Sequence, residues 1–366
     1  MNKKIIFVGM LILIAAFSIS GCSALKATDT AKAALTDYYG YYNDEKIDKC
    51  IDMLDDGVID DLGSMDDTET IYYSRRYLLG EVEEFNLQSF DSDGNFNQVS
   101  VVLEVSTKYE NCDNFVNEQY VFSVSGDDVM IIGFELDPEP VPDQMIKEYF
   151  ESYTDLRKVQ NMYIPYVIGA EGLFDKAAVQ MQADYAYASG GNYKSHEITD
   201  FYYNYQKLDW GDDIYYIMQL YAGLKFENED FSLYAEISRQ DNKVRFNYLE
   251  YYPKSAYEVL GKYYDNLKNG NTRAILNMYA PGFFEISTMT ADEWEKGVLK
   301  VYASDYGKMI DYSISSWDYS IISYNNQDIE VYGFYVTTEF EGGVFDEYIL
   351  IAKGETERAI VGHQIN

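Results

Sequence analysis

The sequence predicts an α+β fold of three tandem repeats, each with N-terminal helices packed on a curved, four-stranded antiparallel sheet. Three observations predict it. An amphipathic helical motif occurs three times, β-rich runs with short polar breaks follow each copy, and prolines mark two junctions. The expected boundaries give a leader at 1–21 and repeats at 22–137, 138–252 and 253–366.

The helical motif places apolar residues at i, i+3, i+4 and i+7, which form one face of an α-helix. Its copies begin at Leu35, Ile146 and Leu260, with steps of 111 and 114 residues. A second stretch of helical pattern follows each copy, at 68–79, 171–188 and 291–306. Each repeat is therefore expected to start with helices.

The β-rich runs follow the helices and are separated by turn residues. In the first repeat we expect strands at 82–90, 97–109, 115–125 and 129–136. Breaks rich in Asn, Asp and Gly recur in the other two repeats, for example at 211–213, 240–242, 325–328 and 341–343. Short breaks of this composition indicate antiparallel hairpins. Strands of this length should twist and curl around the opening helix.

Prolines mark both junctions. Pro138, Pro140 and Pro142 lie between the first and second repeats, and Pro253 lies between the second and third. Proline lacks a backbone donor and clashes with the preceding helical turn, so it belongs at breaks between elements.

The leader combines a positive start, an apolar run and a small-residue exit. Lys3 and Lys4 precede the apolar run 5–19, and Ser20-Gly21-Cys22 follows it. This pattern is typical of an export signal, and the run is short for a membrane span, which takes about 20 residues. The ending resembles the bacterial lipobox. That resemblance implies cleavage before Cys22 and a diacylglycerol joined to its sulfur as a thioether. The alternative is an ordinary secretory leader.

The chain is strongly acidic. Its net charge is −34, and −36 without the leader, which holds two lysines and no acid. Nucleic acid is excluded as a partner because its phosphates require Lys and Arg. Charge does not attract the chain to an anionic membrane either, so a lipid on Cys22 is the expected membrane contact. We expect a lipid-anchored location on the extracytoplasmic side of the cell membrane.

Few residues suit catalysis or metal binding. His196 and His363 fall in different repeats, which argues against a shared metal site, and no zinc, P-loop or serine-hydrolase spacing is present. We therefore predict no catalytic, cofactor-binding or metal-binding residue.

Cys50 is expected on the apolar face of a helix and Cys112 at a hairpin tip. We expect two thiols there, with a disulfide as the alternative that an extracytoplasmic location permits.

Two further patterns have both a functional and a structural interpretation. The segment 91–95 has oxygen side chains where a calcium loop begins, but Phe96 and Val102 occupy the positions that need Gly and Glu, which favours a hairpin turn. Tyrosine-rich segments at 201–205 and 215–216 suit a platform for sugars or peptides, or simple cross-strand packing.

The element order and repeat length through 22–366 resemble the cone-shaped fold of the nuclear-transport-factor-2-like (NTF2-like) superfamily. That superfamily includes ketosteroid isomerases and SnoaL-type cyclases, and small bacterial envelope lipoproteins also carry such domains. In its enzymes, a carboxylate inside the cone acts as the general base. The resemblance implies the same cone in each repeat of this chain.

We therefore expect a membrane-anchored, non-catalytic lipoprotein that binds an envelope protein, a peptide or a glycan through its tandem domains. The first alternative is an isomerase- or cyclase-like enzyme, which needs a cone pocket with a buried carboxylate. The second is the substrate-binding lipoprotein of an importer, which would use βαβ units in place of hairpins. No cofactor is expected in the leading hypothesis.

Overall fold

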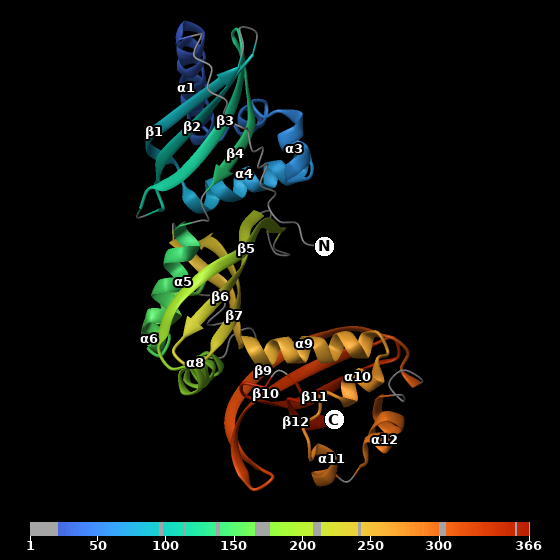
Figure 1. Cartoon of the computed structure of the whole chain (residues 1–366). Helices are drawn as coiled ribbons and strands as arrows, with labels where there is room; N and C mark the ends of the chain where they lie inside the picture. The colour runs from blue at the N-terminus through green and yellow to red at the C-terminus, as the bar shows by residue number, and fades with distance from the viewer. Residues whose placement is uncertain are drawn as a thin grey trace.

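A computed structural model describes residues 21–94, 98–112, 114–136, 140–164, 176–207, 214–240, 243–287, 289–299, 305–355 and 357–365. The three repeats follow one another from the top to the bottom of Figure 1. Within these ranges, no helix combines the length and the apolar composition that a membrane span requires.

The first repeat opens with four helices and continues with four strands. The helices are α1 (Gly21–Asn43), α2 (Ile47–Ile51), α3 (Asp56–Leu62) and α4 (Met65–Leu79). The strands are β1 (Val82–Gly94), β2 (Val99–Tyr109), β3 (Val116–Ser125) and β4 (Asp128–Leu136). The predicted strands of this repeat are confirmed, with ends that shift by a few residues.

The second repeat has the same order. Its helical part contains α5 (Pro140–Ser152), α6 (Leu156–Val159), the 3₁₀ turn η1 (Gln160–Met162) and α8 (Lys176–Gly190). Its strands are β5 (Tyr193–Lys207), β6 (Ile214–Phe226), β7 (Asp230–Gln240) and β8 (Lys243–Pro253). Two junction prolines act as expected, because Pro140 is the first residue of α5 and Pro253 is the last of β8. Pro138 lies outside the described residues.

The third repeat contains α9 (Lys254–Lys268), α10 (Thr272–Leu276), α11 (Phe283–Ile286), α12 (Ala291–Trp294) and the π-helical turn η2 (Glu295–Leu299). Its strands are β9 (Met309–Tyr324), β10 (Gln327–Phe340), β11 (Gly343–Ala352) and β12 (Ile360–Ile365). The helix predicted at 291–306 is regular only through Trp294. Gly297, a poor helix former, lies in the π-helical turn that follows.

The twelve strands form three separate antiparallel sheets, in the orders β1-β2-β3-β4, β5-β6-β7-β8 and β12-β11-β10-β9. Each sheet takes its strands from one repeat, and helices precede each sheet (Figure 1). The predicted fold class, α+β with three repeats, is confirmed.

Equivalent contacts recur in the three repeats. The segment after the opening helix makes a parallel bridge to the last strand at Leu54–Ile131, Tyr163–Phe246 and Tyr279–Ile360. Gly80 and Gly191 directly follow the last helix before their sheets and have φ near +80°, and Gly307, shortly before the third sheet, has the same φ. A Cβ at these positions would collide with Glu110, Glu227 and Glu341 at the end of each second strand.

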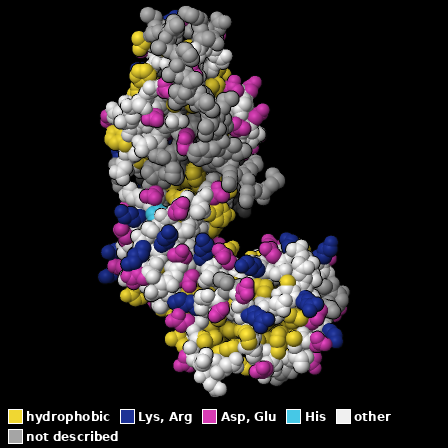
Figure 2. Space-filling view, viewed as in Figure 1, with side chains coloured by type: hydrophobic (Ala, Val, Ile, Leu, Met, Phe, Trp, Pro, Cys, Tyr) yellow, Lys and Arg dark blue, Asp and Glu magenta, His cyan; other side chains and the backbone are white. Residues whose placement is uncertain are grey.

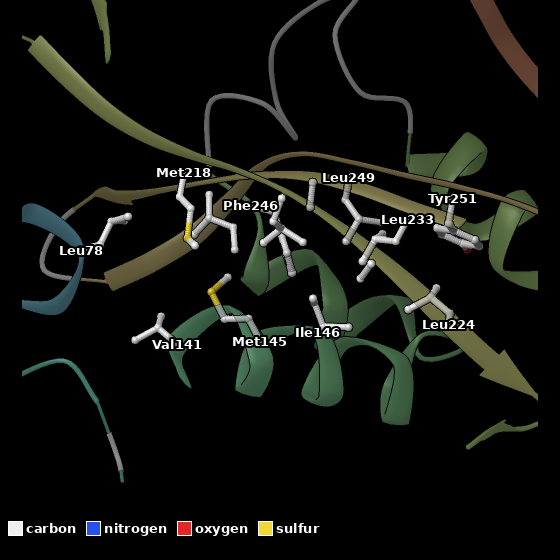
Figure 3. Packing of buried hydrophobic residues seen from close by; sticks show 14 of the residues in the cluster. Leu78, Val141, Met145, Ile146, Met218, Leu224, Leu233, Phe246, Leu249 and Tyr251 are labelled. Carbon is white, nitrogen blue, oxygen red and sulfur yellow. The ribbon is translucent and has the colours of Figure 1, made fainter. Parts of the chain in front are cut away.

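The core of each repeat lies between the opening helix and the inner face of its sheet. In the second repeat, Met145 and Ile146 of α5 point toward Met218, Phe246 and Leu249 of the sheet (Figure 3). All five side chains are buried. Burying this apolar surface on both elements is what holds the helix to the sheet.

Aromatic side chains join neighbouring repeats. Trp317 of β9 is fully buried, and its indole N–H donates to the backbone oxygen of Tyr251 in β8 at 2.8 Å. Lys353 donates to the backbone oxygen of Ser189 at 2.7 Å, which also links the third repeat to the second. Between the first two repeats, Tyr73 stacks on Tyr216 with ring centroids 5.9 Å apart.

Candidate functional site

Two carboxylates lie at equivalent places inside the first and third repeats. In each repeat, a bulge between the third and fourth strands precedes Phe122, Ile237 or Ile351. Counting back four residues gives Glu118, Leu233 and Glu347. Their partners on the second strand are Val105, Ala222 and Val336. Each partner lies five residues before the glutamate that directly follows the second strand, so the three positions correspond.

Glu118 is held by donors from three elements. Tyr39 of α1 donates to one carboxylate oxygen at 2.6 Å, and Thr107 of β2 donates to the same oxygen at 2.8 Å. Tyr109 donates to the other oxygen at 2.7 Å. The Arg75 guanidinium of α4 lies 3.1 Å from that second oxygen, and this buried pair is 5% and 0% exposed. Burial, then the charge of Glu118, raises the pKa of Tyr39 and of Tyr109, so both stay donors.

Glu347 has a matching set of partners. Tyr264 of α9 and Thr338 of β10 donate to it, each at 3.1 Å. The third partner is His363 of β12, whose Nε2 lies 2.9 Å from the carboxylate, as Arg75 lies beside Glu118 in the first repeat. The other ring nitrogen of His363 lies 2.7 Å from the hydroxyl of Tyr279. The His363 and Glu347 side chains are both 0% exposed.

The second repeat replaces this polar set with apolar residues. Four residues after Leu35 and Leu260, the first and third repeats have Tyr39 and Tyr264, whereas Phe150 follows Ile146. Leu224 stands where the other repeats have a threonine, and Leu233 stands where they have glutamate. Phe150, Leu224 and Leu233 are all buried. The hydroxyls and the carboxylate are therefore present or absent together.

These interior carboxylates are not accessible to a substrate. Both side chains are fully buried and accept hydrogen bonds from the protein on both oxygens. A pocket of about 300 Å³ in the third repeat lies elsewhere, lined by residues that include Tyr279, Pro281 and Arg358 but not Glu347. The interior carboxylates serve as acceptors that satisfy buried donors.

The outer face of the second sheet carries a different set of residues. Its register places three rows of four residues across the strands, namely Tyr202, Gln219, Glu236, Tyr248; Asp200, Tyr221, Tyr234, Glu250; and Glu197, Gly223, Ser232, Tyr252. We call these twelve residues the tyrosine–acid face. It combines five tyrosines with four carboxylates, and none of its positions holds Lys or Arg; the adjoining row, Ser195-Lys225-Asp230, holds one Lys and one Asp.

The tyrosine rings form a row that crosses all four strands. Ring centroids are 6.3 Å apart between Tyr202 and Tyr221, 5.1 Å between Tyr221 and Tyr234, and 6.0 Å between Tyr234 and Tyr248. Tyr221 is 46% exposed and Tyr248 is 38% exposed. Cross-strand aromatic pairs stabilise a sheet, but this packing does not require rings as exposed as those of Tyr221 and Tyr248.

The carboxylates of this face orient the rings. Glu236 accepts from the Tyr234 hydroxyl at 2.6 Å and from the Gln219 amide at 2.9 Å. Glu250 accepts from the hydroxyls of Tyr248 and Tyr252, the latter at 2.8 Å. A carboxylate accepts about four hydrogen bonds, so Glu236 and Glu250 retain capacity for further donors.

The other two sheets differ at these places. At the positions of Tyr221 and Tyr234, the third sheet has Tyr335 and Tyr348, with ring centroids 4.5 Å apart. The first sheet has Glu104 and Gln119 there. The third sheet has Asp318 and Gly362 in place of Tyr202 and Tyr248, so the tyrosine row across four strands is particular to the second repeat. Figure 2 shows acidic side chains on the visible face of all three repeats, so acidity alone marks no single repeat.

The residues singled out in the sequence have structural roles where they are described. His196 of β5 lies 3.0 Å from Asp143 of α5, with its side chain 6% exposed. Cys50 and Cys112 are buried thiols, as expected. Residues 91–94 continue β1 in register with 99–102. Within the described ranges, no three His, Cys, Asp or Glu side chains are grouped to hold a metal ion.

The predicted lipidation site lies at the edge of the described chain. Residues 1–20 of the leader are outside it. Cys22 falls in the first turn of α1, which begins at Gly21. The tyrosine segments at 201–205 and 215–216 are described in part, and Tyr202 contributes to the tyrosine–acid face while Tyr216 stacks on Tyr73.

Comparisons with known proteins identify no family. No family model matches the sequence, and no curated protein matches it. Among solved structures, an NTF2-like protein involved in plasmid conjugation is similar with 12% identity and a TM-score of 0.18, over 46% of this chain and 76% of that one. A cystatin-like protein from Ruminococcus gnavus has 7% identity and a TM-score of 0.16, over 53% and 74%.

Proposed function

We propose that the chain is a non-catalytic lipoprotein, anchored through Cys22 to the outer side of a bacterial membrane, that binds a partner through tandem NTF2-like repeats. The observation that carries the binding role is the contrast between the two candidate surfaces. The interior carboxylates are fully buried, whereas Tyr221 and Tyr248 of the tyrosine–acid face are exposed. Binding to a surface agrees with this contrast better than chemistry inside a cone.

The anchor is supported by the leader pattern and by the start of α1. If Cys22 carries the lipid, only residues 23–26 separate it from Ala27, which is buried in the first repeat. A tether this short would hold the first repeat next to the membrane surface. The acidic chain would then extend away from anionic lipids, since like charges repel.

Counting thiols tests the anchor. The chain has three cysteines, and Cys50 and Cys112 are thiols. If Cys22 is a thioether, the membrane-extracted protein has two thiols after full unfolding, and it incorporates labelled palmitate. A Cys22→Ala variant should lose the palmitate label and keep the same two thiols. Three thiols in the wild-type chain, or labelling that persists in the variant, would contradict the proposal.

A further inference from the structure

We propose that the tyrosine–acid face binds a cationic partner segment, one that presents Lys or Arg side chains in an extended conformation. This inference rests on the proposed binding function and names its partner class. The face combines four carboxylates with a row of aromatic rings, of which Tyr221 and Tyr248 are exposed, and its twelve positions hold no basic residue. An ammonium or guanidinium group is the chemistry that both features favour, by ion pairing and by contact with the ring faces.

The carboxylates have no cation among the residues of their own face. Glu236 and Glu250 accept from tyrosine hydroxyls and an amide, which are neutral donors. Half-burial of these carboxylates beside the rings reduces their contact with water, so a cation that enters would interact more strongly than at a fully exposed site. Charge complementarity therefore selects a basic partner over an acidic or purely apolar one.

The row of the face that contains Gly223 allows close approach. Gly223 lies in the interior of β6, and a Cβ built there would meet no atom within 4 Å. It lies next to Tyr221, whose ring is 46% exposed. A glycine in the interior of a strand often marks a place where a ligand or another backbone approaches the sheet.

The test uses the full mature chain and three probes: a nine-residue peptide of alternating Arg and Gly, the same peptide with Glu for Arg, and a neutral chito-oligosaccharide. Calorimetric titration at about 0.02 M and about 0.15 M salt measures each Kd. We expect the basic peptide to bind, with affinity that falls at the higher salt. The acidic peptide and the oligosaccharide should not bind at this face.

Two sets of variants assign the binding to the face. Glu236→Gln with Glu250→Gln keeps acceptors for the tyrosine hydroxyls but removes two charges, and should weaken binding of the basic peptide by about tenfold. The matched control, Glu104→Gln with Glu135→Gln, makes the same charge change on the outer face of the first sheet and should change Kd less than twofold. Tyr221→Phe should retain binding, whereas Tyr221→Ser should weaken it.

Three results would overturn the inference. One is that the basic peptide does not bind. The inference would also fail if both pairs of glutamine variants weakened binding equally, because the peptide would then be attracted by the overall negative charge and not by this face. The third is an oligosaccharide that binds and loses affinity in Tyr221→Ser. In that case the face is still a binding surface, so the proposed function stands while the cationic partner is rejected.

Discussion

At the scale of single residues, the interior of the repeats is defined by one position on the third strand. Glu118 and Glu347 organise hydroxyl donors around a carboxylate, whereas Leu233, Phe150 and Leu224 belong to the apolar core of the second repeat. A buried carboxylate is tolerated only when its donors surround it, and the donors in turn need the carboxylate. This explains why the polar residues change as a set.

Replacing Glu347 alone should therefore destabilise the chain strongly. Glu347→Leu leaves Tyr264, Thr338 and His363 without their acceptor, and we expect a loss of about 3 kcal/mol or more in the free energy of unfolding. Urea unfolding of the full chain measures it.

The apolar set of the second repeat provides the control. Adding Tyr264→Phe, Thr338→Leu and His363→Leu to Glu347→Leu reproduces Phe150, Leu224, Leu233 and Leu249 in the third repeat. We expect this quadruple variant to recover more than half of the loss, because the three donors that Glu347 satisfied are removed together with it. A quadruple variant less stable than Glu347→Leu would show that the residues do not act as a set.

The thiol of Cys50 gives a second prediction at this scale. Burial raises its pKa to about 12, and it donates a weak hydrogen bond to the backbone oxygen of Tyr38 at 3.6 Å. Since the thiolate is the reactive form, the native chain should not react with a disulfide reagent at pH 8 over minutes. The same reagent should titrate the thiol at once in urea. Fast labelling of Cys50 in the native chain would show that this thiol of α2 is not buried.

The sequence could predict some of these residues and not others. The expected apolar environment of Cys50 follows from helical spacing alone. Glu118 and Glu347 were not predicted, because acidic residues are abundant and their inward direction depends on bulges that shift the strand register. The helix motif does not align them directly, because Leu35 and Leu260 are 225 residues apart whereas Glu118 and Glu347 are 229 apart.

At the scale of elements, the strands and most helices follow from local pattern. Turn residues bounded the strands of the first repeat to within a few positions, since hairpins need Gly, Asn or Asp at their tips. The π-helical turn at Glu295–Leu299 was not predicted, because tertiary packing around Trp294 and Leu299 decides its backbone. The outer tyrosine row depends on register between strands, which local pattern does not give.

At the contact between the second and third repeats, we predict that replacing Trp317 lowers the stability of the chain. The Trp317 ring lies near Phe231 and Tyr251 of the second sheet, with centroids 5.9 and 6.5 Å away. Trp317→Ala should cost about 3–5 kcal/mol in unfolding free energy, and Trp317→Phe less, because a ring remains. Denaturant unfolding measures both. Equal effects of the two variants would show that the lost hydrogen bond to Tyr251, not packing, dominates.

Glu229 gives a pH-dependent prediction at the same contact. Burial raises its pKa, although Ser255 and Tyr332 donate to it at 3.1 and 3.3 Å. With a folded pKa above the unfolded value, the cost of the buried charge is absent at low pH and grows as pH rises through the folded pKa. Glu229→Gln should therefore stabilise the chain at pH 7, and the gain should vanish toward pH 4.

Glu227 is the matched control of opposite sign. A hydrogen bond from Lys194, at 2.8 Å, lowers its pKa, so its ionised form is favoured by folding. Glu227→Gln should lose a small amount of stability at pH 7 and none below the folded pKa. If both variants shift stability in the same direction with pH, the effect is net charge and not the local environment. Thermal unfolding from pH 4 to 8 distinguishes them.

At the scale of the whole molecule, three similar repeats have diverged in what they bury and what they expose. The first and third each bury a carboxylate with its donors, and the second has Leu233 at that position and carries the tyrosine–acid face. Repeat length and element order were readable from the sequence because each repeat must form its own core. The tyrosine–acid face could not be predicted from the sequence, because four strands bring its residues together.

Hydroxyl-radical footprinting of the full mature chain, with and without the basic peptide, tests the central claim that the tyrosine–acid face is the binding surface. The account predicts that the peptide protects Tyr221 and Tyr248 from oxidation, while Tyr187 of α8, which is 51% exposed, is oxidised equally in both samples. Unchanged oxidation of Tyr221 and Tyr248 with bound peptide, or protection confined to Tyr187 or to the pocket beside Pro281, would contradict it.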